Sequence, residues 1–72
     1  MISVNQVTLE WRANYSIDEL LRDTKDNRQI FKVPGHGNII IINGEVLGVV
    51  EKKEYLIQDN DSITIIQAVG GG

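Results

Sequence analysis

The stretch NIIIIN, residues 38–43, constrains the fold more than any other part of the chain. Four consecutive β-branched isoleucines between two turn-forming asparagines predict a β-strand. Because the apolar run is continuous rather than alternating, it predicts a central strand that is buried on both faces. Asn43-Gly44 follows directly and is the strongest short hairpin signal in the chain, so residues 45–47 are expected to form the returning strand.

The amino-terminal residues show the alternation that is typical of strands. Ile2 and Val4 are spaced by two, and the same spacing recurs after Asn5-Gln6. Asparagine tolerates the positive φ that a tight hairpin requires, so two short strands joined at Asn5-Gln6 are expected. The apolar positions of the second strand are Val7, Leu9 and Trp11.

A helix is predicted to begin at Ser16, because Ser16 and Glu19 have the spacing of a capping box. Tyr15 and Leu20 stand at the hydrophobic-staple positions on either side of this cap. The helix is expected to end near Asp26-Asn27. Apolar residues recur at helical spacing and form one stripe, at Ile17, Leu20, Leu21 and Thr24.

The remaining segments give weaker signals. Residues 27–38 lack a clear period and contain Pro34, so an irregular connection with one or two apolar anchors is expected. Residues 49–55 predict a short edge segment or an irregular turn. Asp59-Asn60-Asp61 predicts a turn in which aspartate side chains accept hydrogen bonds from backbone amides, followed by a last strand over residues 62–69.

The resulting order, β-β-α-β-β-β, predicts an α+β fold of the β-grasp (ubiquitin-like) type. We expect a mixed sheet of four to five strands covered by one main helix, with the first and last strands both in central positions. Residues 1–69 would form this domain and residues 70–72 a flexible glycine tail. A ferredoxin-like fold is the alternative, but it needs a second helix, which residues 27–38 are poorly suited to form.

Composition excludes several classes of function. A chain of 72 residues is one small domain, with no room for a deep catalytic cleft beside its core. Its net charge of −3 argues against a nucleic-acid-binding protein and suits a protein partner with basic patches. The absence of cysteine excludes disulfides, cysteine-ligated metal sites and a thiol nucleophile. The single histidine, His36, has no partner cluster, so a solvated loop residue is expected.

The sequence contains no apolar run long enough to cross a bilayer and no visible signal peptide, so a cytoplasmic location is expected. The chain ends in IIQAVGGG, residues 65–72. Three extended glycines reach about 10 Å and have no side chains. Such a stalk could carry a carboxylate into the active site of another protein. A frayed end or a cloning remnant is the alternative interpretation.

Two segments, NIIIINGEVL and IQDNDSITIIQAVGGG, resemble the ThiS/MoaD family of ubiquitin-like sulfur-carrier proteins, and the ThiS branch more closely. The resemblance covers residues 39–72, and SIDELL is similar to the short helix of the family. Asn60 stands where the family usually has glycine, and Gly48-Val49 stands where thiamine-type members usually have Pro-Arg. The prolines that molybdopterin-type members have near Gln67-Ala68 are absent as well.

The resemblance implies a function for the carboxyl-terminal residues. An E1-like enzyme of the ThiF/MoeB type would use ATP to adenylate Gly72, with Gly71 beside it. A sulfur-transfer system would then convert Gly72 into a thiocarboxylate. The implied acceptor is a synthase of the thiazole-synthase type in thiamine biosynthesis. The chain would bind no cofactor and no nucleic acid, and would act as a protein co-substrate rather than an enzyme. The resemblance also implies partner-binding positions at Ile66, Ala68, Val69 and Gly70.

Three alternatives stay open. The chain could be a molybdopterin-synthase small subunit or a carrier for another sulfur pathway. It could also be a ubiquitin-like binding module with an inert tail, which recruits its partner through a sheet face. A small-molecule enzyme is disfavoured, because the sequence offers no set of nucleophile and base residues.

Overall fold

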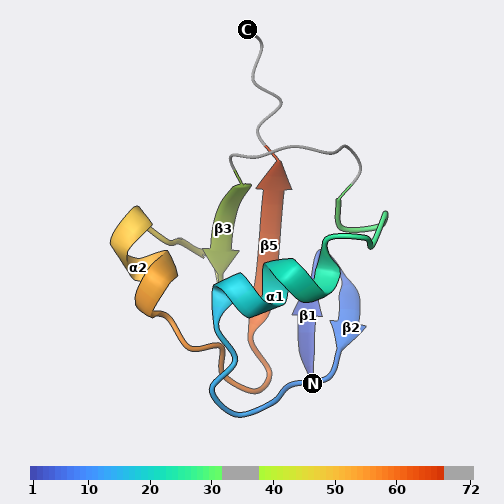
Figure 1. Ribbon diagram of the computed structural model, residues 1–72, viewed down its shortest axis with the longest axis horizontal. Helices are drawn as coiled ribbons and strands as arrows, with labels where there is room; N and C mark the ends of the chain where they lie inside the picture. Colours follow the sequence, from blue (N-terminus) through green and yellow to red (C-terminus); the bar gives the residue numbers. More distant parts are fainter. Residues whose placement is uncertain (32–37, 68–72) are drawn as a thin grey trace, which may run out of the picture.

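The computed structural model describes residues 1–31 and 38–67. Five strands form one mixed sheet in the order β2-β1-β5-β3-β4 (Figure 1). Strands β1 and β5 are parallel, and the other neighbouring pairs are antiparallel. The expected mixed sheet of four to five strands and the β-grasp arrangement, with the first and last strands both in central positions, are therefore confirmed. The strands are β1 Ile2–Val4, β2 Val7–Leu9, β3 Asn38–Ile42, β4 Glu45–Val46 and β5 Ser62–Gln67.

Both predicted hairpins form at asparagine turns. Asn5 and Gln6 have φ angles of 48° and 70°, and they join β1 to β2. Asn43 and Gly44, with φ angles of 50° and 88°, join β3 to β4. Positive φ at both central residues is the mark of the type I′ turn, whose twist matches that of paired strands. Asparagine and glycine adopt this region at the least steric cost.

Helix α1, Ile17–Thr24, begins where the capping box predicted it and ends slightly before the predicted boundary. The Ser16 hydroxyl accepts a hydrogen bond of 3.1 Å from the Glu19 amide. It also donates to the Glu19 carboxylate at 3.1 Å, so the two cap residues hold each other. Tyr15 and Leu20 are both buried, as expected for a hydrophobic staple. In Figure 1 the helix crosses one face of the sheet.

The prediction of an edge segment or irregular turn over residues 49–55 is wrong, because Val49–Glu54 forms a second helix, α2. The Glu51 carboxylate accepts from the Gly48 amide at 3.1 Å and stabilises its first turn. None of the α2 residues is buried, and Val49 is 71% exposed. The helix therefore has no apolar stripe, which is the signal by which a helix is recognised in a sequence.

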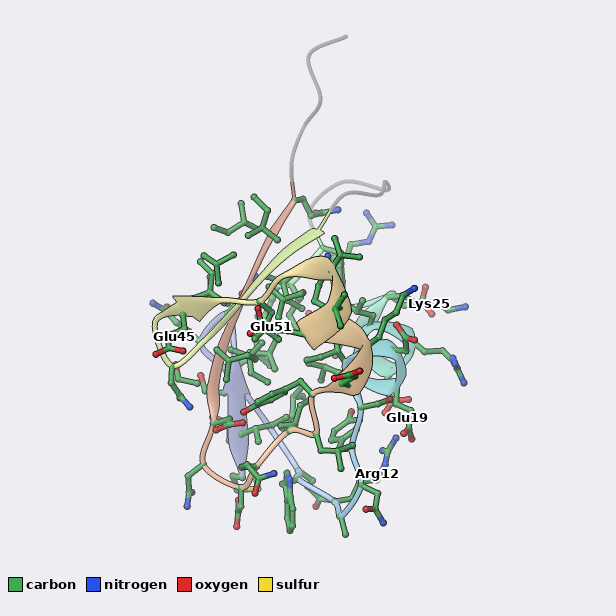
Figure 2. The ribbon with its side chains drawn as sticks, turned by 90° about the vertical axis from the view of Figure 1, so that its left-hand side faces the viewer. Arg12, Glu19, Lys25, Glu45 and Glu51 are labelled. Atoms are coloured by element: carbon green, nitrogen blue, oxygen red, sulfur yellow. The ribbon has the colours of Figure 1, made fainter. Side chains whose placement is uncertain are left out.

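The hydrophobic core lies between the sheet and α1. The prediction that β3 is buried on both faces is wrong. Ile40 and Ile42 are buried beneath α1, whereas Ile39 is 42% exposed on the opposite face. Successive strand residues point to opposite faces, and α1 lies on only one of them (Figure 2). The largest fully buried side chains of residues 1–31 and 39–67 are Ile2, Val4, Ile17, Leu20, Ile40, Ile57 and Ile63.

Asp61 is buried, with 6% of its surface exposed, and it joins three segments. Its carboxylate accepts hydrogen bonds from the Tyr55 hydroxyl at 2.5 Å, the Gln58 amide at 2.8 Å and the Asn43 side chain at 2.9 Å. The bond from Gln58 confirms that an aspartate of this turn caps a backbone amide. Burial acts to raise the pKa of Asp61, but these hydrogen bonds favour the charged form and lower its pKa overall.

Replacing Tyr55 with phenylalanine is expected to lower the free energy of unfolding by about 1–3 kcal/mol, because the buried Asp61 carboxylate loses a donor. Urea unfolding at neutral pH measures this loss. Because the folded-state pKa of Asp61 is lowered, its contribution is present above about pH 4 and declines as the pH falls through the folded pKa. The variant should therefore also unfold at a higher pH on acidification.

Tyr15→Phe is the matched control for this change. Tyr15 donates to Asp23 at 2.8 Å, but the Asp23 side chain is 44% exposed and water can replace the lost donor. The control should lose clearly less stability than Tyr55→Phe. Equal losses in the two variants would show that the buried Asp61 network is not a distinct source of stability.

Candidate functional site

The predicted functional residues lie between Ile66 and Gly72 in the sequence, and the structure describes one of them. Ile66 lies in β5, and Gln67 is the last residue of that strand. Ala68, Val69 and the glycines 70–72 lie outside the described residues. The roles predicted for those five residues stay predictions, and the site is built from the strand that precedes them.

Ile65 and Ile66 point to opposite faces of the sheet, as strand alternation requires. Ile65 is 3% exposed and pairs with the buried Ile40. Ile66 is 44% exposed and pairs with Ile39, which is similarly exposed. Ile65 therefore points into the core and Ile66 points away from it, so the side chain of Ile66 is accessible to a partner. The face on which Ile66 lies is called the outer face below.

Ile66 belongs to an apolar patch that spans three adjacent strands of the outer face. Its members are Ile39, Ile41, Val46 and Ile66. The register places Ile39 beside Ile66 and Ile41 beside Val46, which is 62% exposed. Of these four residues the sequence indicates only Ile66, because a continuous isoleucine run predicts a strand that is buried on both faces. The pairing of β3 with β4 at the Asn43-Gly44 turn places Ile41 beside Val46, so this hairpin signal would have revealed two of the others.

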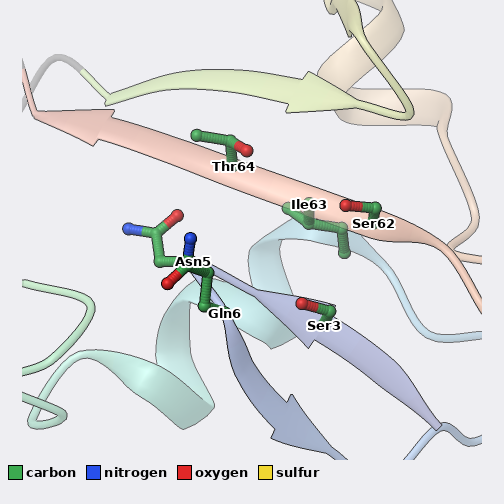
Figure 3. Close-up of a pocket in the computed structure, with 6 residues that line it drawn as sticks. All are labelled: Ser3, Asn5, Gln6, Ser62, Ile63 and Thr64. Carbon is green, nitrogen blue, oxygen red and sulfur yellow. The ribbon is translucent and has the colours of Figure 1, made fainter.

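Beside the apolar patch the outer face carries neutral polar groups. Hydroxyl and amide side chains line an open depression of about 400 Å³ where β1 meets β5 (Figure 3). Its lining residues are Ser3, Asn5, Gln6, Ser62, Ile63 and Thr64. These groups can donate and accept hydrogen bonds but carry no charge. Glu45 is the one charged residue in the five strands, and it pairs with the inward-facing Ile42.

Arg12, Glu19 and Lys25 lie on the helix side of the molecule, whereas Glu45 lies at the opposite side (Figure 2). The Arg12 guanidinium lies 3.1 Å from the Glu19 carboxylate, 3.0 Å from the Asp23 carboxylate and 4.0 Å from the Tyr15 ring centroid. The hydrogen bond from Arg12 lowers the pKa of Glu19, and the bond from Tyr15 lowers that of Asp23. These charges satisfy one another on the α1 side, whereas the outer face stays neutral.

The described part of the chain offers no metal-binding cluster and no membrane-spanning helix. Among residues 1–31 and 38–67, no three histidine, cysteine, aspartate or glutamate side chains are grouped so that they could hold a metal ion. His36 lies outside those ranges. Neither helix in the same ranges has the length and apolar character needed to cross a membrane.

Comparison with known proteins agrees with this architecture. The sequence model of the ThiS family matches residues 2–72. Ubiquitin-related modifier 1 of Sclerotinia sclerotiorum is 28% identical over 69 residues, which is 92% of this chain and 63% of that protein. The chain thus spans less than two thirds of that relative. The crystal structure of the thiamine biosynthesis protein ThiS from Geobacter metallireducens aligns with a TM-score of 0.66. It is 23% identical, and the alignment covers 99% of this chain and 97% of that one.

Proposed function

The chain belongs to the ThiS family, and from this premise we propose that it is a sulfur carrier whose working group is the carboxylate of Gly72. The observation that carries the proposal is the position of the apolar patch. It lies at the end of β5, directly before the segment that leads to the glycines. A partner that docks on the patch would therefore also reach the carboxyl-terminal residues. The chain acts as the co-substrate of that partner.

The proposed chemistry has two steps. A carboxylate oxygen of Gly72 attacks the α-phosphorus of ATP in the partner, which releases pyrophosphate and leaves an acyl adenylate. Hydrosulfide then attacks the acyl carbonyl carbon, the bond to the AMP phosphate oxygen breaks, and the departure of AMP leaves a thiocarboxylate at Gly72. Glycine suits both steps because no Cβ crowds the reacting carbonyl. The chain contains no cysteine, so the terminus is its only group able to carry transferable sulfur.

The test of this proposal is ATP–pyrophosphate exchange with the E1-like adenylating enzyme of the same organism. The purified chain should stimulate exchange in proportion to its concentration until the enzyme is saturated. A chain that leaves the exchange rate at its background value, with an enzyme that activates another carrier, would contradict the proposal.

The proposed acceptor is a thiazole synthase, which would use the sulfur to build the thiazole of thiamine. Membership of the ThiS family supports this acceptor over the molybdopterin synthase large subunit. The two acceptors can be separated with the thiocarboxylated chain. With the thiazole synthase, sulfur should be transferred to the thiazole product. With the molybdopterin synthase large subunit, no dithiolene should form.

Binding of the activating enzyme is expected to change little with salt. The apolar patch carries no charge and its neighbours are hydroxyl and amide groups, so docking would release few counterions. Raising the salt concentration from about 0.05 M to about 0.5 M should alter the dissociation constant by less than about threefold. Titration calorimetry measures it. A fall in affinity of tenfold or more would instead indicate that acidic groups on the helix side meet a basic partner surface.

A second function would use the same activated terminus. The relative from Sclerotinia sclerotiorum is named a ubiquitin-related modifier, and this likeness favours conjugation as the second candidate. In that case a lysine amine of a target protein would attack the activated Gly72 carbonyl and form an isopeptide bond. Peptides that carry a glycine remnant on lysine would identify this outcome.

A further inference from the structure

Asn5 makes an unusual pair of hydrogen bonds to the central strand. Its side-chain oxygen accepts from the Ile65 amide at 2.7 Å, and its side-chain nitrogen donates to the Ile65 carbonyl at 3.0 Å. Both groups of one side-chain amide thus pair with both backbone groups of one residue of β5. Asn5 lies at the end of β1 beside β5 (Figure 3), and these bonds are partly shielded from water.

The sheet topology explains why this pair is needed. Strand β1 pairs with β5 at Ser3–Ser62 and Val4–Ile63, and the Asn5 amide adds a bond of 3.0 Å to the Ile63 carbonyl. The chain then turns away at Asn5-Gln6, where both φ angles are positive. The next backbone groups on this edge of β5 belong to Ile65. The Asn5 side chain replaces the missing strand residue, because unpaired, partly buried backbone groups are costly.

Ile65 directly precedes Ile66 of the apolar patch. The opposite edge of β5 is held by β3 through the Ile40–Ile65 and Ile39–Ile66 pairs. Asn5 therefore supplies the hydrogen bonds on the remaining edge of β5, at the residue next to the apolar patch. Resting on the proposed function, we propose that Asn5 is a positioning residue for recognition by the activating enzyme. It fixes the backbone at Ile65 and thereby the direction in which Ile66 and Gln67 are presented.

The turn alone does not require this side chain. The φ of 48° at Asn5 can be adopted by glycine without steric cost, so Asn5→Gly keeps the turn and removes the two hydrogen bonds. Asn14 supplies a matched control, because it has a φ of 61° and lies in the loop between β2 and α1. Asn14→Gly also replaces asparagine with glycine and increases the freedom of the backbone, but it does so at a position outside β5.

The experiment compares the full-length chain with Asn5→Gly and Asn14→Gly in two measurements. The first is hydrogen exchange of the Ile65 amide by NMR. The second is pyrophosphate exchange with the E1-like enzyme, at a temperature where circular dichroism shows all three proteins fully folded. Asn5→Gly should accelerate exchange at Ile65 and lower kcat/KM about five- to tenfold, mainly through KM, because a looser segment must be ordered on binding. Asn14→Gly should match the wild type in both.

The outcomes separate this inference from the proposed function. If the enzyme activates the wild-type chain and fully folded Asn5→Gly has the same kcat/KM, the positioning role is overturned and the proposed function is not. Equal losses in Asn5→Gly and Asn14→Gly would do the same, since they would trace the effect to backbone freedom. A wild-type chain that the enzyme does not activate would overturn the proposed function and this inference with it.

Discussion

Deletion of Gly72 is expected to abolish adenylation by the activating enzyme and to leave the free energy of unfolding unchanged. Removal of one residue withdraws the terminal carboxylate by up to about 3.5 Å. Reacting atoms must lie about 3–3.5 Å apart, and a misplacement of about 1 Å can cost roughly a hundredfold in rate. The stability should not change, because the described hydrophobic core consists of residues between Ile2 and Ile65. Pyrophosphate exchange and urea unfolding measure the two quantities.

Gly72→Ala is the control for this deletion. It keeps the length of the chain and adds one methyl group next to the reacting carbonyl. Gly72→Ala should therefore be adenylated more slowly than the wild type. The chain without Gly72 should not be adenylated at all. Activation of the shortened chain at the wild-type rate would rule out Gly72 as the reacting residue.

Substitution of the adjacent Ile65 and Ile66 by aspartate is expected to have opposite effects. Ile65→Asp should unfold the domain, because it places an unpaired charge in the core of a small protein whose total stability is about 5–15 kcal/mol or less. Ile66→Asp should stay folded, since 44% of that side chain is already exposed. It should weaken binding of the activating enzyme at least about tenfold, because a charge would enter an apolar interface.

Leu56→Asp provides the control on a different surface. Leu56 is 46% exposed, about as much as Ile66, but it pairs with Ser16 at the start of α1 rather than lying in the apolar patch. This variant should be folded and should bind the enzyme with wild-type affinity. If Leu56→Asp and Ile66→Asp weaken binding equally, the apolar patch is not the docking surface. If Ile66→Asp unfolds the chain, Ile66 belongs to the core instead.

The sequence predicts the fold correctly at turns and helix starts, because these depend on interactions between residues that are close in the chain. The hairpins at Asn5-Gln6 and Asn43-Gly44 follow from the tolerance of asparagine and glycine for positive φ. The start of α1 follows from the reach of the Ser16 hydroxyl to the Glu19 amide. These signals act over a few residues, so they do not depend on how the rest of the chain packs. Together they fix the order of most elements.

The remaining features depend on tertiary arrangement. The NIIIIN run is apolar at every position, so its pattern cannot show that Ile40 faces the core and Ile39 faces outward. The placement of α1 on one side of the sheet decides this. Helix α2 escaped prediction because it buries none of its side chains. The bonding of Asn5 to Ile65 joins residues that are 60 positions apart, and it follows only from the pairing of β1 with β5.

Intact-mass spectrometry can show whether Gly72 carries sulfur. The chain would be incubated with the activating enzyme, ATP and a sulfur donor, and then fragmented. We expect a product heavier by the exchange of one oxygen for one sulfur, with the change confined to the fragment that contains Gly72. An unchanged mass in the presence of an enzyme that consumes ATP with this chain, or sulfur located in any other fragment, would rule out Gly72 as the residue that carries sulfur.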